Sequence, residues 1–181
     1  MVEHPEGNSS AQAMVATGAN GEEGSVVKFL ADEMLGKLAK WLRLMGYDTL
    51  YLSPADDHQL ARLARAEGRV LLTRDTQLAA RRGLDSLFIE SDNPQEQLRQ
   101  VFTDLSLTTF HPFSRCPICN ASLEEVDTAA LEDRIPLYVL RTQDQFRLCP
   151  QCGRVYWRGS HWQKMSQMIQ SLLPLQNQDF I

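Results

Sequence analysis

Short apolar runs and longer stretches with helical spacing alternate along the chain from residue 26 to residue 106. In the segment 33–46, for example, Leu38, Leu42 and Met45 recur every three or four positions, the period of one helix face. Strands that alternate with helices of about 10–15 residues predict βαβ units and a parallel sheet flanked by helices. The pattern predicts strands at 26–32, 47–53, 69–75 and 84–91, and helices at 33–46, 53–68, 76–83 and 93–106.

Beyond residue 110 the pattern changes to short apolar runs set among turn residues, which predicts a small second unit. We expect strands at "IPLYVLRT" (135–142), "QFRLC" (145–149) and "RVYWRG" (154–159). An amphipathic helix is expected to follow at 161–173, with apolar residues at helical spacing.

The first 25 residues have no apolar period and are rich in Gly, Ser, Asn, Ala and Glu, which is typical of a disordered leader. They lack the basic and apolar regions of a secretory signal, and no stretch approaches the roughly 18 apolar residues of a membrane span. We therefore expect a soluble, cytoplasmic protein. The predicted organisation is a leader at 1–25, an α/β domain at 26–110, a second unit at 111–173 and a tail at 174–181.

Composition and charge change this picture only slightly. The contents of 43% hydrophobic and 23% charged residues are usual for a soluble globular protein. The formal net charge is −5, but four acids and no lysine or arginine lie in residues 1–27. The rest of the chain is therefore almost neutral, which argues against a strongly basic, nonspecific nucleic-acid binder.

Each predicted strand of the α/β domain is followed closely by an acid. Asp32 ends the first strand, Asp56 and Asp57 begin the helix after the second, Asp75 ends the third, and Asp92 follows the fourth. The carboxyl ends of parallel strands share one edge of a sheet, where ligands bind in open α/β folds. We therefore expect these acids on one rim. Taken singly, an acid such as Asp56 or Asp75 is more simply explained as a helix cap.

A rim of carboxylates suggests a metal ion, because clustered carboxylates repel one another unless a cation lies between them. Oxygen ligands suit Mg²⁺ or Mn²⁺, which could activate a water and stabilise the leaving oxygen in phosphodiester cleavage. Thr73, on the same strand face as Asp75, could hold a carboxylate or a bound water. Candidate phosphate contacts are Lys37, Lys40 and Arg43 on the first helix, which a solvated face explains more simply, and the equally ambiguous Arg74, Arg81 and Arg82.

All four cysteines occur in two CxxC pairs, "CPIC" (116–119) and "CPQC" (149–152), separated by 29 residues. The spacing predicts a zinc site formed by Cys116, Cys119, Cys149 and Cys152. Two disulfides are the rival interpretation, but nothing in the leader indicates an oxidising compartment. A redox CxxC is less favoured, because neither pair opens a helix of a βαβ unit. A zinc ion with four protein ligands has no open position, so it stabilises the fold rather than catalysing a reaction.

The segment 152–165 mixes aromatic and basic side chains, a combination that can stack on bases and bind phosphates. Arg154, Arg158 and Trp157 are the candidate RNA contacts there. The alternative is that the aromatic residues pack the small core of this unit.

Three runs of the chain together resemble a known family: "KFLADEMLGKLAKWLRLMGYDT", "DDHQLARLARAEGRVLLTRDTQL" and "CPIC…CPQCGRVYWRGSHW". They are similar to the C-terminal RNase domain of the Mut-seven exonuclease family, in which a zinc ribbon follows a PIN-like ribonuclease fold. The resemblance covers roughly residues 27–173. It implies a metal-dependent ribonuclease whose acids surround a divalent ion. By position it assigns this role to Asp32, to Asp75 in the threonine-x-aspartate motif, to Asp57 or Asp56 on the second helix, and to Asp92 as a fourth acid.

The sequence therefore predicts an α/β, PIN-like parallel sheet flanked by helices, followed by a small C-terminal four-cysteine zinc ribbon. The predicted function is an Mg²⁺- or Mn²⁺-dependent ribonuclease that hydrolyses phosphodiester bonds of single-stranded or structured small RNA, with the ribbon supporting the fold and RNA binding. The alternative is a non-catalytic RNA- or protein-binding module with structural zinc. A phosphoacceptor domain is a weaker candidate, because it does not explain the cysteines and no lysine closes a later strand.

Overall fold

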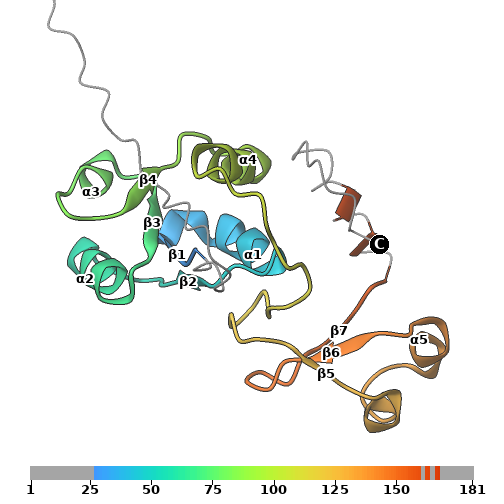
Figure 1. Ribbon diagram of the computed structural model, residues 1–181. Helices are drawn as coiled ribbons and strands as arrows, with labels where there is room; N and C mark the ends of the chain where they lie inside the picture. The colour runs from blue at the N-terminus through green and yellow to red at the C-terminus, as the bar shows by residue number, and fades with distance from the viewer. Residues whose placement is uncertain (1–26, 160–161, 164–165, 168–181) are drawn as a thin grey trace, which may run out of the picture.

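The computed structural model describes residues 27–159, 162–163 and 166–167. Figure 1 shows two units joined by one extended segment: a parallel sheet with helices around it, and a smaller antiparallel sheet with its own short helices. The predicted leader at 1–25 and tail at 174–181 lie outside the described residues, as does most of the predicted helix at 161–173.

The sheet of the first unit is four-stranded and wholly parallel, as the alternating pattern predicts. Its strand order is β2-β1-β3-β4, so β1 and β3 lie next to each other at the centre. The strands are much shorter than the apolar runs of the sequence that predict them. They are β1 (Phe29–Ala31), β2 (Thr49–Tyr51), β3 (Val70–Thr73) and β4 (Ser86–Phe88).

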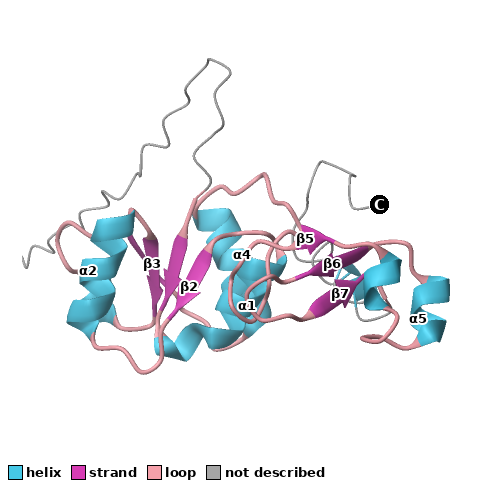
Figure 2. Ribbon diagram, turned by 90° about the horizontal axis from the view of Figure 1, so that it is seen from below, coloured by secondary structure: helices cyan, strands magenta, loops and turns pink. Residues whose placement is uncertain are grey.

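Helices cover both faces of this sheet (Figure 2). On one face, Leu38 and Leu42 of the first helix pack with Leu98 and Val101 of the last helix of this unit. On the other face, Leu60 and Leu78 pack with residues of β1 and β3. The helices are α1 (Gly36–Leu44), preceded by the 3₁₀ turn η1 (Glu33–Leu35), then α2 (Asp57–Glu67), α3 (Thr76–Ala79) and α4 (Pro94–Asp104).

Two glycines end helices where the sequence predicts. Gly68 follows α2 in the left-handed conformation with φ 59°, which suits a residue without a Cβ. Gly46, with φ 95°, follows α1, and a Cβ there would lie 2.2 Å from the carbonyl oxygen of His111. Glycine at position 46 therefore serves both the turn and the close passage of the chain that leads to the second unit.

The second unit contains a three-stranded antiparallel sheet in the order β5-β6-β7. The predicted strands at 145–149 and 154–159 are confirmed as β6 and β7, but the strand predicted at 135–142 is wrong, because this segment forms helix α5. Pro136 stands at the helix start, and Val139 is buried against Leu131 whereas Tyr138 is 70% exposed. The elements are β5 (Glu124–Glu125), η2 (Thr128–Leu131), α5 (Leu137–Thr142), β6 (Phe146–Leu148) and β7 (Val155–Trp157).

The two units meet at the outer edge of β2. The backbone N–H of Thr49 donates to Asn120 Oδ1 (3.0 Å), and the carbonyl of Thr49 accepts from Arg43 Nε (2.8 Å). Arg43 Nη1 also donates to the carbonyl of Ile118, inside the first CxxC pair (2.9 Å). Arg43 is thus buried, at 8% exposure, and does not lie on a solvated helix face with Lys37 and Lys40 as the sequence suggests. Its donors satisfy carbonyls of both units, which holds the ribbon against the sheet.

Asp48, just before β2, is the charged centre of this junction. It accepts hydrogen bonds from Arg69 Nη1 (2.8 Å) and Asn120 Nδ2 (2.7 Å), and Arg115 lies 3.8 Å away. Burial alone raises the pKa of Asp48, but the hydrogen bonds from Arg69 and Asn120 outweigh it, so that the pKa lies below its ordinary value. The ionised carboxylate therefore stabilises the junction.

Asp48→Asn tests this contribution through its pH dependence. The depressed pKa means that the stabilisation is fully present above the unfolded-state pKa of about 4 and is lost as the pH falls through the lower folded-state value. We expect the variant to lose about 1–3 kcal/mol in free energy of unfolding at neutral pH, measured by urea denaturation. The deficit should shrink as the pH approaches about 3.

Asp85→Asn is the matched control, because Asp85 precedes β4 at the same end of the sheet and is exposed. A deficit of Asp48→Asn that does not change with pH, or an equal deficit in the control, would contradict the role of the ionised Asp48.

Candidate active site and cysteine cluster

The centre of the parallel sheet is the point at which chain connections diverge. The connection from β1 leads to β2 on one side, and the connection from β3 leads to β4 on the other. In open α/β sheets, ligands bind beyond the carboxyl ends of strands at such a point. The residues that follow β1 and β3 are Asp32 and Arg74–Asp75, so the predicted acids flank the favoured position.

Thr73 joins the two acids by hydrogen bonds. Its hydroxyl donates to Asp32 Oδ2 (2.7 Å) and accepts from the backbone N–H of Asp75 (3.0 Å). Thr73 is fully buried and Asp32 is 8% exposed, so neither side chain is free to change rotamer without breaking a buried contact. This is the carboxylate contact that the sequence suggests for Thr73.

Both acids also cap the helical turns that follow them. Asp32 accepts from the backbone N–H of Glu33 at the start of η1. One oxygen of Asp75, Oδ1, accepts from the N–H groups of Gln77 (2.7 Å) and Leu78 (2.9 Å) at the start of α3. The capping alternative is therefore correct for Asp75, but it does not exclude a ligand, because a carboxylate has more acceptor positions than these bonds occupy.

The other three predicted acids have different partners. Asp56 caps α2 and forms a capping box with Gln59. Asp57 Oδ2 accepts from Arg81 Nη2 (2.9 Å). Asp92, whose side chain is 85% exposed, is ion-paired with Arg74, and the Nε of Arg74 is buried without a hydrogen-bond partner.

The rim acids are not gathered tightly in this structure. In the part of the chain that is described, three carboxylates never come close enough to share one ion, whereas the four cysteines do. The structure thus brings Asp32, Thr73 and Asp75 together and places Asp56, Asp57 and Asp92 in other contacts. The pairing of Asp57 with Arg81 has no signature in the sequence, because the two residues are 24 positions apart, one at the start of α2 and the other in the loop after α3.

The four cysteine sulfurs lie within 4.8 Å of one another. The Sγ–Sγ distances are 3.4 Å for Cys119–Cys149 and 3.7 Å for Cys116–Cys152, far longer than the roughly 2.05 Å of a disulfide. Sulfurs bound about 2.3 Å from a tetrahedral ion are about 3.8 Å apart. The cluster therefore fits zinc, as the sequence predicts, rather than two disulfides.

The surroundings of the cluster favour thiolates at two positions. Hydrogen bonding from the backbone of Arg154 lowers the pKa of Cys152 to about 6. Burial raises the pKa of Cys116, but the hydroxyl of Tyr156, 3.1 Å from its sulfur, and backbone N–H groups outweigh burial and lower it. At Cys149 burial prevails and raises the pKa to about 12. A metal ion is the partner that lets all four sulfurs be ionised at once.

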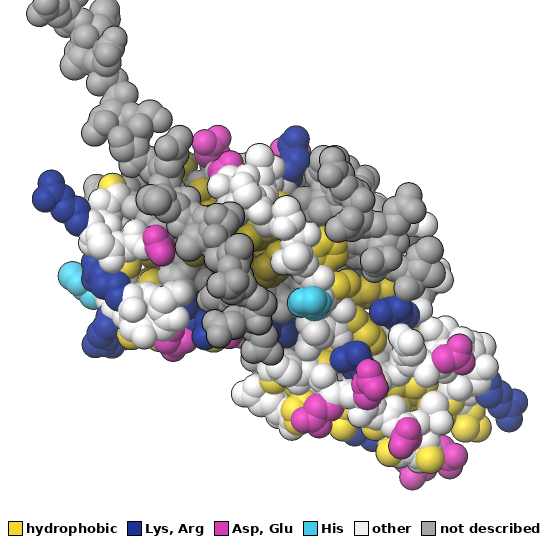
Figure 3. Space-filling model, in the orientation of Figure 1, with side chains coloured by type: hydrophobic (Ala, Val, Ile, Leu, Met, Phe, Trp, Pro, Cys, Tyr) yellow, Lys and Arg dark blue, Asp and Glu magenta, His cyan; other side chains and the backbone are white. Residues whose placement is uncertain are grey.

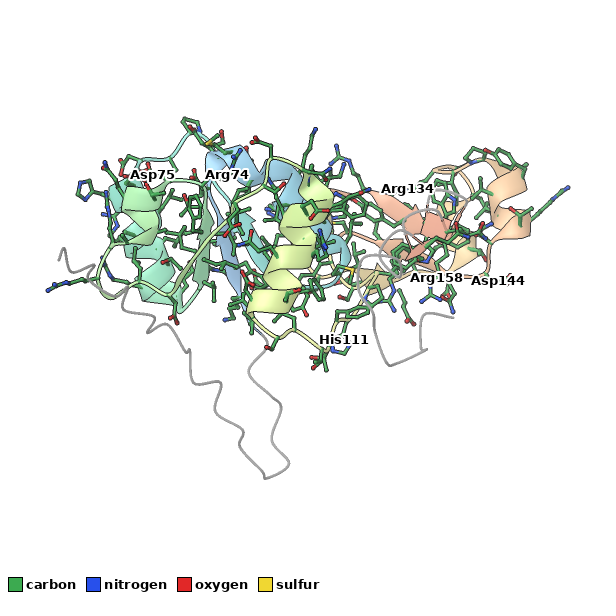
Figure 4. All side chains as sticks on the ribbon, turned by 90° about the horizontal axis from the view of Figure 1, so that it is seen from above. Arg74, Asp75, His111, Arg134, Asp144 and Arg158 are labelled. Atoms are coloured by element: carbon green, nitrogen blue, oxygen red, sulfur yellow. The ribbon has the colours of Figure 1, made fainter. Side chains whose placement is uncertain are left out.

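The predicted RNA contacts are spread over the molecule. Lys37 and Lys40 are exposed on α1, and Arg154 is exposed beside the cysteines. Arg158 lies over the ring of Phe113, at 5.9 Å, whereas Trp157 packs against Phe146 in the small core of the second unit, as the packing alternative predicts. On the face that Figure 3 shows, acidic and basic side chains are interspersed over this unit. Figure 4 shows Arg158 on the side of the molecule away from Arg74 and Asp75.

Residues 27–169 match the family described as the Mut7-C RNAse domain. The chain belongs to this family. The match covers the sheet, the linking segment and the cysteine cluster, so the Mut7-C RNase domain includes both units.

The chain is also similar to a human protein named exonuclease mut-7 homolog, with 35% identity over 101 residues. This similarity covers 51% of the chain but only 12% of the human protein. No solved structure gives a significant match. No helix in the described segments is long and apolar enough to cross a membrane.

Cys149→Ser is expected to abolish stoichiometric zinc, because one of the four sulfurs that would surround the ion, a buried one, is lost. Zinc should be measured by elemental analysis of the purified protein, and unfolding of the second unit followed by tryptophan fluorescence. Tyr156→Phe is the matched control: it removes the hydroxyl near Cys116 but no ligand, and should retain zinc. One zinc ion per chain in Cys149→Ser would disprove the four-cysteine site.

Proposed function

We propose that this Mut7-C RNase domain is a metal-dependent ribonuclease whose active site lies between the carboxyl ends of β1 and β3. The observation that carries the proposal is the hydrogen-bonded link from the Asp32 carboxylate through the buried Thr73 hydroxyl to the backbone N–H of Asp75, at the divergence point of a parallel sheet. Membership of a nuclease family supports it, as does the name of the human relative. We propose RNA, single-stranded or small and structured, as the substrate, and the cytoplasm as the location.

The surroundings of Asp32 differ from those of the structural acid Asp48. Asp48 is partly buried beside Arg69 and Arg115, which balance its charge. Asp32 is more buried, yet its described hydrogen-bond partners, the hydroxyl of Thr73 and the backbone N–H of Glu33, are neutral. A buried carboxylate with neutral partners gains most from a cation at its free acceptor positions.

In this proposal Asp32 and Asp75 hold Mg²⁺ or Mn²⁺, and Thr73 fixes the orientation of Asp32. Such an ion supplies a more acidic water and stabilises negative charge on the leaving oxygen of a phosphodiester. The neighbouring arginines orient the anionic RNA backbone toward the acids. The carboxylates are acceptors already fixed by hydrogen bonds, so little reorganisation is required of them.

The zinc ribbon has a supporting role in this proposal. The cysteine cluster orders the loop whose carbonyls bind Arg43, and that loop carries Asn120 to the edge of β2. The predicted RNA contacts at Arg154 and Arg158 stay predictions. Figure 4 shows Arg158 on the second unit, apart from Asp75 on the first, so an RNA that reaches both must span the two units.

The test is cleavage of a panel of labelled single-stranded, hairpin and transfer-type RNAs with Mn²⁺, Mg²⁺ or EDTA. We expect cleavage with metal only, and a loss of about 100-fold or more in Asp75→Asn and Asp32→Asn, the size typical when one group that stabilises a transition state is removed. Asparagine still caps a helix well, so Asp75→Asn should keep α3.

Asp85→Asn, at the opposite end of the sheet, is the control and should cleave like the wild type. Equal cleavage by Asp75→Asn and the wild type would disprove the site. An absence of metal-dependent cleavage across the panel, with RNA still bound, would instead support the non-catalytic module. The loose spacing of the rim acids also agrees with that alternative.

A further inference from the structure

The ion pair between Asp57 and Arg81 joins the start of α2 to the loop that follows α3, beside the proposed active site. Arg81 Nη2 donates to the carboxylate of Asp57 (2.9 Å), and Nη1 donates to the backbone carbonyl of the same residue (3.2 Å). Both side chains are partly exposed. Two donors of one guanidinium to one residue fix its plane, as a single contact would not.

The pair lies at the rim on which Asp75 ends β3. Helices α2 and α3 pack on the same face of the sheet through Leu60 and Leu78. Asp57 is the first residue of α2, which begins after the carboxyl end of β2, and α3 begins directly after Asp75. Arg81 lies in the loop after α3, six residues beyond Asp75, and its guanidinium reaches Asp57 at the start of α2.

Asp57 is not needed as a helix cap, because Asp56 already forms the capping box of α2. Its carboxylate is neutralised by Arg81, and a carboxylate that holds a guanidinium is a poorer metal ligand than one with neutral partners such as Asp32. The guanidinium has more N–H donors than the contacts to Asp57 use, in the fork geometry that matches a phosphate.

The rim also needs positive charge if its substrate is RNA. Acids alone would repel the phosphates of the backbone. Arg74, between Thr73 and Asp75, is paired with Asp92 as Arg81 is paired with Asp57, so each arginine is held by an acid of the rim. The arrangement separates two kinds of acid: those with neutral partners and those that hold an arginine.

We propose that Asp57 is a positioning residue that aims Arg81 at a backbone phosphate of RNA, in place of the direct metal contact expected from the sequence. This inference rests on the proposed ribonuclease function and specifies which rim residues bind the phosphate. Asp32 and Asp75 remain the metal-binding acids, and Arg81 is the phosphate-binding residue.

Binding of a labelled single-stranded RNA in buffer without added Mg²⁺ or Mn²⁺, followed by fluorescence anisotropy, tests the pair without metal-dependent cleavage and leaves the structural zinc in place. Arg81→Ala should weaken binding about tenfold, as expected for a lost charged hydrogen bond, and reduce the salt dependence by about one phosphate contact. Asp57→Asn removes a negative charge, so simple electrostatics predicts tighter binding. The positioning role predicts weaker binding, and the double variant Asp57→Asn/Arg81→Ala should lose little more than Arg81→Ala alone.

Matched controls distinguish the orientation of the Arg81 guanidinium from the effect of its positive charge alone. Arg62→Ala removes the same charge from an exposed position of α2 and should bind RNA nearly as the wild type does, and Arg81→Lys should restore only part of the affinity because it lacks the fork. All variants should have wild-type urea midpoints, since the pair is partly exposed. RNA binding by Asp57→Asn that equals or exceeds that of the wild type would overturn the inference.

Mn²⁺ binding without RNA, measured by calorimetry, distinguishes this inference from the proposed function. Asp57→Asn should bind Mn²⁺ as the wild type does, while Asp32→Asn and Asp75→Asn should not. If Asp57→Asn loses Mn²⁺ as they do, Asp57 is a metal ligand and the inference fails while the proposed function stands. If Asp32→Asn and Asp75→Asn retain Mn²⁺, it is the proposed metal site that fails.

Discussion

The parallel pairing of β1 with β3 is the constraint on which the candidate site depends. In this register Ala31 lies beside Leu72, and the backbone N–H of Asp32 donates to the carbonyl of Leu72. The next residue of β3 is Thr73, whose hydroxyl therefore meets the carboxylate of Asp32. A shift of one residue would turn Thr73 to the other face of the sheet. Because the leucines of both strands are fully buried, such a shift would also expose core side chains, so packing keeps the acids in place.

A second set of contacts ties the zinc ribbon to the same sheet. Arg43 is buried between the carbonyl of Thr49 and those of Pro117 and Ile118, so one guanidinium serves the edge strand and the first cysteine pair. Buried donors and acceptors are costly to leave unpaired. The conformation of the loop at the first cysteine pair and the pairing of the backbone at the edge of β2 therefore depend on each other. This junction lies at the end of the sheet opposite to the acids.

Much of the fold is readable from the sequence because its signals are local. The helical spacing of Leu38 and Leu42, the capping acids and the terminal glycines predict α1, α2 and β3 correctly. The segment 135–142 was not readable in this way, because a six-residue helix and a strand give similar short apolar runs, and burial of Val139 against Leu131 decides between them. The sequence pattern places the acids after the strand ends, but their partners depend on contacts between segments far apart in sequence, such as Asp57 at the start of α2 with Arg81 in the loop after α3.

Asn120 also affects whether the first unit could remain monomeric without the ribbon. Its side chain occupies the position that a neighbouring strand would take beside Thr49, at the open edge of β2. Removal of the ribbon would leave backbone donors and acceptors there without partners, and such edges recruit strands from other molecules. The ribbon is therefore more than a metal-binding unit, because it protects the open edge of the sheet from self-association. The α/β unit cannot be separated from it without exposing that edge.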